Sequence, residues 1–97
     1  KRFGKDKIFY WTSPTKEEVD FVVKPGLKVK QLIQVCYNIA DPATKKREAT
    51  ALVKASKELK CSDLLAITEG YEAEEKFDNK KIRYIPLWKY LCQQFFP

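Results

Sequence analysis

The sequence predicts one α/β domain, in which a mixed sheet packs against helices. Short runs of β-branched and aromatic residues recur along the chain, and a long segment with helical spacing separates two of them. Hydrophobic residues make up 44% of the 97 residues, which is enough for one small core. The sequence shows no internal repeat, so we expect residues 1–97 to form a single domain.

Three strands are predicted in the first part of the chain, at residues 8–12, 19–23 and 27–37. These runs contain the β-branched and aromatic residues that strands favour. Ser13-Pro14 marks the turn after the first strand. Lys24-Pro25-Gly26 predicts a tight turn, which makes the second and third strands an antiparallel hairpin.

Alternation along these strands predicts which side chains share a face of the sheet. In the second strand it places Asp20 on the face opposite Phe21, together with Val22. In the third strand it places Gln34 on the face opposite Ile33. The residues around Gln34 are apolar, which is typical of a central strand covered on both sides.

A crossover helix is predicted after the hairpin. Asp41 fits the N-cap, Pro42 fits the first helical position, and the apolar positions from 44 to 59 follow helical spacing. A buried-type strand follows at residues 64–68, so the helix is expected to join two parallel strands by a right-handed crossover.

The last third of the chain predicts one further strand and one further helix. Residues 69–79 are polar and acidic and are expected to form a loop. Residues 82–86 predict a strand, which Pro86 confines to an end or an edge. A C-terminal helix begins at residue 87, and the apolar segment 86–91 is either a cap on the sheet or a docking face for another domain.

Composition excludes several classes of chemistry. The chain has no histidine, which excludes the usual zinc hydrolases and the Ser-His and Cys-His nucleophiles. Its three cysteines, Cys36, Cys61 and Cys92, lack the spacing of a metal site, so reduced thiols are expected. The sequence contains no signal segment and no membrane span, so we expect a cytoplasmic protein without a membrane partner.

The positive charge is concentrated in the first 60 residues. These contain 14 Lys and Arg against 7 Asp and Glu, whereas residues 61–97 contain 5 against 6. The cluster Lys45-Lys46-Arg47 at the start of the crossover helix is the candidate nucleic-acid-binding site, because its charges can attract phosphates. The alternative is an ordinary solvated face of the helix.

Asp20 and Gln34 are the candidate site residues, because a polar side chain inside an apolar strand is costly unless it finds a partner. In the hairpin both can converge on one face. Asp20, the Gln34 side-chain oxygen, the Val35 carbonyl and Glu18 as a second carboxylate are the oxygen ligands that Mg²⁺ or Mn²⁺ would use. The alternative is that Asp20 and Gln34 form hydrogen bonds with each other or with the turn.

Four runs of the sequence resemble a known protein family. They are EEVDFVV, LIQVCYNI, DPATKKREATALVKASKELKCSDLLAIT and IRYIPLWKYL, and together with their spacing they cover residues 8–91. In this order they resemble the C-terminal domain of archaeal-type P-loop (AAA-like) ATPases. The resemblance implies a fragment of a larger ATPase, in agreement with a chain that opens on Lys1 rather than methionine.

The appended domain of that family is similar to the restriction-endonuclease-like fold, whose active members carry the pattern PD-(D/E)xK. The resemblance therefore implies a restriction-endonuclease-like mixed sheet with an antiparallel hairpin, a crossover helix and a C-terminal helix. Asp20 matches the metal-binding acid, Gln34 matches the Glu or Gln of the next strand, and Cys36 stands where the catalytic lysine is expected. A neutral thiol cannot replace an ammonium group.

Three functions are compatible with these observations. The leading hypothesis is a degenerate nuclease-like module of a prokaryotic ATPase that binds DNA or a protein partner. The first alternative is an active Mg²⁺- or Mn²⁺-dependent DNA endonuclease, and the second is a purely structural module for oligomerisation or regulation. ATP is expected only in the ATPase domain of the same polypeptide, because this chain lacks the glycine-rich phosphate-binding motif.

Overall fold

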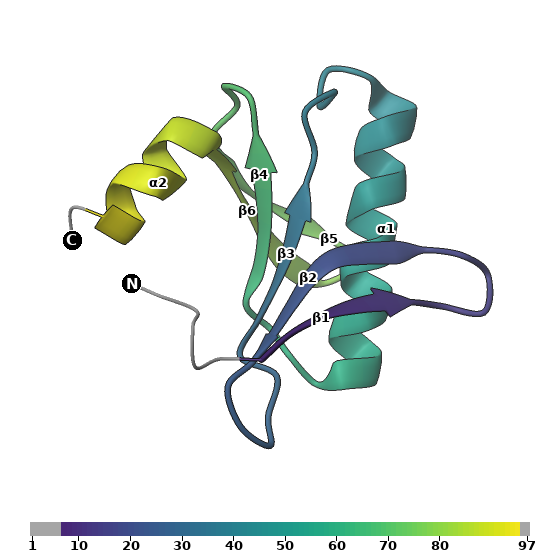
Figure 1. Ribbon diagram of the computed structural model, residues 1–97. Helices are drawn as coiled ribbons and strands as arrows, with labels where there is room; N and C mark the ends of the chain where they lie inside the picture. The colour runs from purple at the N-terminus through teal and green to yellow at the C-terminus, as the bar shows by residue number, and fades with distance from the viewer. Residues whose placement is uncertain (1–6, 96–97) are drawn as a thin grey trace.

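The computed structural model describes residues 7–95. Within them, six strands form one mixed sheet in the order β1-β2-β3-β4-β6-β5, accompanied by two helices (Figure 1). The elements are β1 (Lys7–Thr12), β2 (Glu18–Lys24), β3 (Gln31–Val35), α1 (Pro42–Leu59), β4 (Leu64–Thr68), β5 (Ala73–Phe77), β6 (Lys80–Pro86) and α2 (Leu87–Phe95). The predicted α/β class, with its hairpin, crossover helix and C-terminal helix, is confirmed. No helix within the described residues is long and apolar enough to cross a membrane.

The sheet combines both kinds of strand pairing. β1, β2 and β3 pair antiparallel, β3, β4 and β6 pair parallel, and β5 returns antiparallel to β6. As predicted, α1 connects the parallel strands β3 and β4, a connection that a short turn cannot make.

The ends of α1 follow the capping residues of the sequence. The Asp41 carboxylate accepts hydrogen bonds from the Thr44 backbone N–H (3.3 Å) and from the Thr44 hydroxyl (2.6 Å). Pro42 occupies the first turn, where its missing N–H costs nothing. Lys60 ends the helix in the left-handed conformation, with φ of 56°. The N-cap prediction is therefore confirmed.

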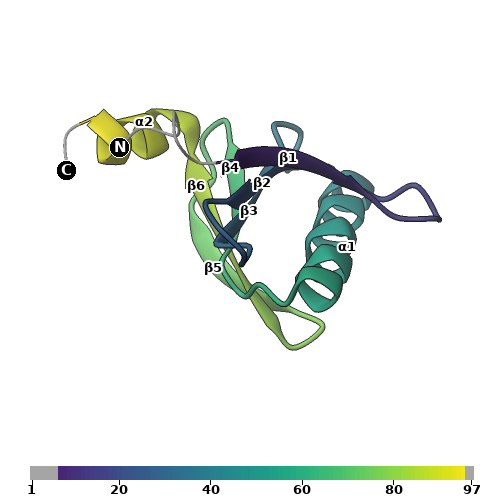
Figure 2. The ribbon, with the colours of Figure 1, turned by 60° about the horizontal axis from the view of Figure 1, so that its bottom comes forward.

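Helices lie against the two faces of the sheet. Figure 2 shows α1 packed along one face and α2 at the far end of the other. On the α1 side, Leu52 packs among buried residues that include Leu32 and Leu64. On the opposite side, Ile33 and Leu65 belong to a smaller cluster against which α2 packs only its partly buried side chains. Most of the core therefore lies between α1 and the sheet.

A β-bulge changes the predicted alternation of β2. Phe9 pairs with Val22, but Trp11 pairs with Val19, so two β2 residues, Asp20 and Phe21, oppose one residue of β1. Val19 and Val22 consequently face α1 together. The predicted alternation holds from Asp20 to Val23 and is wrong at Val19, which lies on the α1 side with Asp20 and Val22 because of the extra residue in β2.

The connection between β2 and β3 is longer than predicted. β3 begins at Gln31 rather than at residue 27, and residues 25–30 form an irregular loop instead of a tight turn at Lys24-Pro25-Gly26. Leu27, whose apolar side chain suggested a strand, is 97% exposed. A residue without a neighbouring surface to pack on gains nothing from strand pairing, so its β propensity has no effect here.

The loop predicted at residues 69–79 contains the edge strand β5. Its side chains alternate between half-buried and exposed, and its polar composition resembles a loop because one face is solvated. Asp78 and Asn79 join β5 to β6 with φ values of 54° and 67°, which match a type I′ hairpin turn. β6 accordingly begins at Lys80, two residues earlier than predicted.

Candidate functional site

The Gln34 side chain, only 1% exposed, is held by the backbone of β2. Its Oε1 accepts a hydrogen bond from the Asp20 backbone N–H (2.9 Å), and its Nε2 donates one to the Glu18 carbonyl oxygen (2.7 Å). One side-chain amide thus satisfies one donor and one acceptor of the bulged strand, as a neighbouring peptide would.

Asp20 completes this contact from the other strand. Its Oδ2 accepts a hydrogen bond from the Val35 backbone N–H at 2.8 Å. Regular pairing of β2 with β3 stops at Phe21 and Ile33. Beyond that point, β2 and β3 are joined by three hydrogen bonds, each between a side chain of one strand and a backbone group of the other. We call this arrangement the side-chain clamp; it consists of the Asp20 and Gln34 side chains and the backbone of Glu18, Asp20 and Val35.

The clamp brings together the residues that the sequence analysis proposed as metal ligands. It also engages two of their oxygens, Gln34 Oε1 and Asp20 Oδ2, in hydrogen bonds. Among residues 7–95, no group of three or more Cys, Asp and Glu side chains is arranged to hold a metal ion. The alternative was that Asp20 and Gln34 form hydrogen bonds with each other or with the turn; the Gln34 side chain does bond Asp20, but at its backbone N–H, while Asp20 Oδ2 bonds Val35 and not the turn. Metal binding stays a prediction.

A pocket of about 440 Å³ opens beside the clamp and adds Glu48, which the sequence analysis missed. Asp20, Glu18 and Glu48 line it together with Arg47. Burial raises the pKa of Glu48 and nearby Asp20 raises it further, whereas Arg47, at 3.6 Å, lowers it. The helical spacing of the sequence could have indicated this, because Glu48 lies one turn before Leu52, on the side of the helix that faces the sheet.

Cys36, at the position where a lysine was expected, is buried (2% exposed). Its backbone N–H donates to the Ile67 carbonyl at 2.7 Å, so β3 stays attached to β4 here. Burial, with a smaller contribution from Glu48, raises the pKa of the thiol to about 11. The group is protonated and neutral at pH 7, so it supplies neither a nucleophile nor a positive charge.

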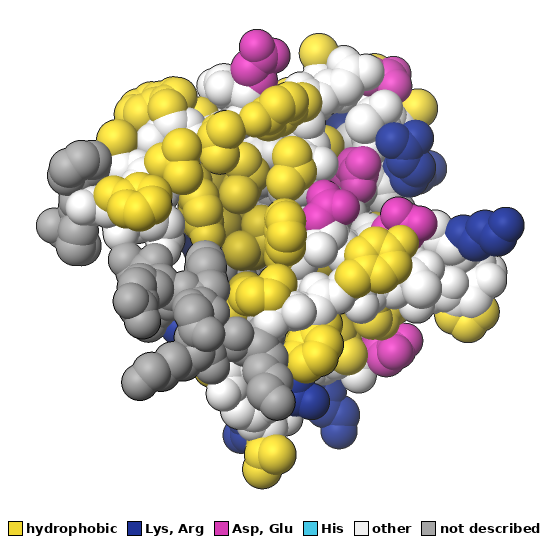
Figure 3. Space-filling view, in the orientation of Figure 1, with side chains coloured by type: hydrophobic (Ala, Val, Ile, Leu, Met, Phe, Trp, Pro, Cys, Tyr) yellow, Lys and Arg dark blue, Asp and Glu magenta, His cyan; other side chains and the backbone are white. Residues whose placement is uncertain are grey.

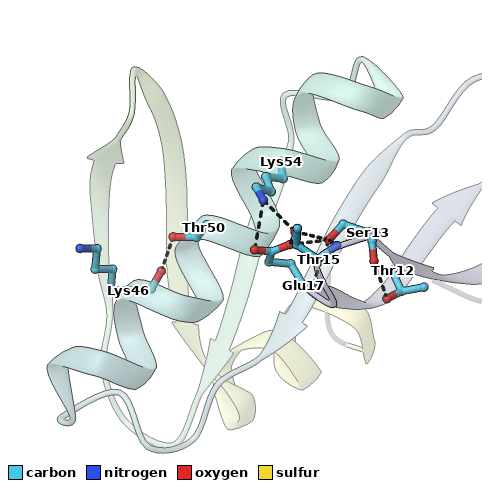
Figure 4. Close-up of polar contacts among 7 residues, drawn as sticks. All are labelled: Thr12, Ser13, Thr15, Glu17, Lys46, Thr50 and Lys54. Carbon is cyan, nitrogen blue, oxygen red and sulfur yellow. Dashed lines mark hydrogen bonds and ion pairs between the residues drawn. The ribbon is translucent and has the colours of Figure 1, made fainter.

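The loop between β1 and β2 forms one wall of the pocket and is tied to α1. Figure 4 shows the Glu17 carboxylate accepting hydrogen bonds from the Ser13 and Thr15 hydroxyls and pairing with Lys54 of α1. Lys54 Nζ lies 3.1 Å from both Glu17 Oε2 and Thr15 Oγ1. The hydroxyls, then Lys54, lower the pKa of Glu17 to about 2. Glu17 therefore stays ionised over the ordinary pH range.

Two of the three predicted nucleic-acid-binding residues are in ion pairs. Lys45 Nζ lies 2.9 Å from a Glu75 oxygen and 4.9 Å from the centre of the Tyr71 ring. Arg47 pairs with Glu48, whereas Lys46 points to solvent. Further along α1 two more lysines are paired with acids, as Lys54–Glu17 and Lys57–Asp78. DNA phosphates would therefore have to compete with the acidic partners of these side chains for binding.

The face of the sheet opposite α1 carries a broad exposed hydrophobic surface. Figure 3 shows hydrophobic side chains running across this face, with acidic side chains to the right of them. Its centre is an apolar groove of about 290 Å³, lined by Ile8, Phe21, Val23, Ile33, Ile67 and Tyr90. Phe21 is 43% exposed, Leu91 43% and Trp88 62%. We call the surface formed by the groove and these exposed side chains the apolar face.

Residues 86–91 were predicted either to cap the sheet or to dock another domain. The cap is present in part, because Leu87 and Tyr90 pack on the smaller core cluster. Trp88 and Leu91 are exposed, and docking of another domain stays a prediction.

Comparison of the chain with protein-family models, curated proteins and solved structures gave no match. The conclusions about function therefore depend on the geometry described above.

Proposed function

We propose that this domain is a non-catalytic docking module that binds another protein unit through its apolar face. The observation that carries the proposal is a preformed apolar groove lined by the exposed Phe21 and by Tyr90 of α2, a helix on which Trp88 and Leu91 are exposed as well. Exposed apolar surface of this kind is unfavourable in water and is typical of interaction sites. The partner that the family resemblance implies is the ATPase domain of the same polypeptide.

The polar residues support a structural role for the former nuclease-like positions. Asp20 and Gln34 use their polar atoms to hold two strands together, and Cys36 is a buried neutral thiol. Phe21 alternates with Val22 and lies on the apolar face, and the clamp holds the adjacent Asp20 of the same strand. The residues that would form the catalytic centre of a nuclease thus hold the strand that carries Phe21. Ion pairing of Lys45 and Arg47 favours a protein partner over DNA.

The proposal is tested by measuring binding to the ATPase region of a member of the resembled family, produced as a separate polypeptide. Calorimetric titration should give saturable binding, and Phe21→Glu or Leu91→Glu should weaken it at least about tenfold, because a charge would be buried at an apolar interface. Lys46→Glu, on the exposed side of α1, is the control and should leave the affinity unchanged. Equal affinity for all four proteins would overturn the proposal.

A metal-dependent endonuclease is the second candidate, favoured by one observation: Glu18, Asp20 and Glu48 line the same pocket. Mg²⁺ often binds through one or two carboxylates and completes its shell with water and substrate phosphate, so a pair of these residues could hold it. Plasmid cleavage with Mn²⁺ should then be lost in Glu48→Gln and in Asp20→Ala. If the three proteins give the same signal, any cleavage comes from a contaminant.

A further inference from the structure

The two edge strands of the sheet, β1 and β5, form borders that differ in how well they are protected against pairing with another strand. Figure 2 shows β1 along one border and β5 along the other. Among residues 7–95, β1 pairs with β2 on one side only, which leaves a row of backbone N–H and C=O groups along the other side. Such a row is a template for another strand unless charges, proline or a covering element block it.

The β1 border has few of these protecting features, because its single charged residue is Lys7, at the first position of the strand. From Ile8 to Thr12 the strand has no charged residue and no proline. Phe9 is 46% exposed and Tyr10 58%, although both belong to the strand. The bulge beside this border is in β2, opposite Tyr10, so it does not interrupt the outer side of β1. The free border therefore combines unpaired backbone groups with exposed aromatic side chains.

The β5 border has the opposite character. Its exposed side chains are Glu74 and Lys76, and Glu74 pairs with Lys81 of β6. Glu75 is tied to Lys45 of α1. Alternating exposed charges discourage the approach of a second sheet. A chain with one open and one protected border can pair once and then stop, which gives a closed dimer rather than a fibre.

We infer that two copies of this chain pair antiparallel through β1, which joins their sheets into one continuous sheet. A two-fold axis perpendicular to the sheet brings the same strand from both copies together and keeps equivalent faces on the same side. Phe9 or Tyr10 lies nearest the axis, and no like charges meet between Ile8 and Thr12. Ile8 lines the apolar groove, so the grooves of the two copies become neighbours.

This interface uses the backbone groups of the β1 border, whereas the docking function proposed above uses side chains of the apolar face, so the two are tested separately although Ile8 belongs to both. The first test is the molar mass of the whole chain by sedimentation equilibrium between about 1 and 200 μM, which should rise towards twice the monomer value. Tyr10→Lys should shift the midpoint at least about tenfold to higher concentration, because two like charges would meet near the axis. Glu74→Lys introduces a lysine at an exposed position of the β5 border; it is the control and should leave the midpoint unchanged.

The second test locates the interface. In a Cys92→Ser background, the remaining thiols Cys36 and Cys61 are buried. Phe9→Cys or Tyr10→Cys is then oxidised mildly; residues facing each other across an antiparallel pair lie within disulfide reach, so one of the two should give a covalent dimer. A monomeric chain at all concentrations, or a dimer that neither cysteine crosslinks and Tyr10→Lys does not weaken, overturns the inference. If Trp88→Glu is the one variant that abolishes the dimer, self-association takes place through the apolar face, and this result also overturns the inference.

Discussion

At the scale of single residues, Gln34 shows how one side chain can replace strand pairing. Regular pairing of β2 with β3 stops at Phe21 and Ile33, and beyond it the Gln34 amide provides partners for the Asp20 N–H and the Glu18 carbonyl. The amide is suited to this because it carries a donor and an acceptor side by side. The sequence identified Gln34 as misplaced for packing, and the structure gives the reason: it is bonded to the backbone and not exposed.

The clamp predicts that Gln34→Leu destabilises the domain by about 2–4 kcal/mol, because two backbone groups lose their partners. Gln34→Glu should also destabilise it at pH 7, since an ionised carboxylate accepts from the Asp20 N–H but cannot donate to the Glu18 carbonyl. Urea unfolding measures both. Gln31→Leu, on the same strand but bonded only to the exposed Asp63, is the control and should cost less than about 1 kcal/mol. Equal costs at the two positions would contradict the clamp.

Glu48 predicts a pH dependence of stability with a defined sign. Its folded-state pKa is raised above the ordinary value of 4.5 for a glutamate, chiefly by burial. Between the unfolded and folded pKa values the folded state binds more protons, so the free energy of unfolding falls as pH rises through this window. Glu48→Gln should therefore gain stability relative to the unmodified chain as pH goes from about 4 to 7, measured by urea unfolding at each pH.

Glu17 is the matched comparison, because its pKa is lowered to about 2. Its contribution is present above pH 4.5 and is lost as pH falls towards 2. Glu17→Gln should therefore be less stable than the unmodified chain at pH 7, and the free energies of unfolding of the two proteins should become equal as the pH falls. If the two variants change stability with the same sign at pH 7, the assigned environments are wrong.

At the scale of elements, β5 and β6 form a hairpin that the composition of β5 conceals. Its two turn residues, Asp78 and Asn79, are in the left-handed region, which Asn and Asp enter more easily than other non-glycine residues. Asp78 also pairs with Lys57, so the turn lies against α1. The hairpin therefore depends on turn chemistry and on packing against a helix, and much less on hydrophobic alternation.

This turn predicts that Asn79→Val destabilises the domain by about 1–2 kcal/mol, because a β-branched side chain is strained at positive φ. Asn79→Gly should be close to neutral, since glycine relieves strain but adds entropy to the unfolded chain. Thermal unfolding measures both changes. Asn38→Val, at an exposed loop position whose φ is not positive, should have little effect. A similar cost at positions 38 and 79 would mean that the turn type is misassigned.

At the scale of the whole molecule, the helices cover the sheet unequally. α1 buries one face, whereas α2 is short and lies over one end of the other face, leaving Phe21 and Trp88 exposed. The same asymmetry appears at the borders, where β1 is open and β5 is charged. Burial protects two of the three thiols and leaves the third, Cys92 of α2, in solvent.

The burial of the thiols predicts that one cysteine per chain reacts rapidly with a disulfide reagent at pH 8. Cys92 is exposed, whereas burial raises the pKa of Cys36 to about 11 and also raises the pKa of Cys61. Only the thiolate reacts, so the other two thiols should react at the rate of unfolding. Mass spectrometry after quenching identifies the labelled residue. Labelling of Cys36 as fast as Cys92 would contradict the packing of β3 against α1.

The sequence by itself determined the elements whose cause is local. The Asp41 cap, the α1 stripe and the apolar strand at Leu64–Thr68 are encoded by neighbouring residues, so their positions were predictable. The sequence also singled out Asp20 and Gln34, because a polar residue within an apolar strand needs a partner. It could not place the bulge or identify β5, since both depend on what the adjacent strand presents.

Only the tertiary structure decided what the Asp20 and Gln34 pair does. Asp20 and Gln34 are fourteen residues apart in the sequence, so the hydrogen bond between them depends on the register of β2 against β3, which has no local sequence signal here. The same holds for Glu48, which joins the pocket because α1 crosses above β2 and β3. Which hydrophobic residues stay exposed is also a tertiary outcome. Phe21 and Val23 have similar apolar character, yet Val23 is buried while Phe21 lies open on the apolar face, because burial depends on which element covers each position.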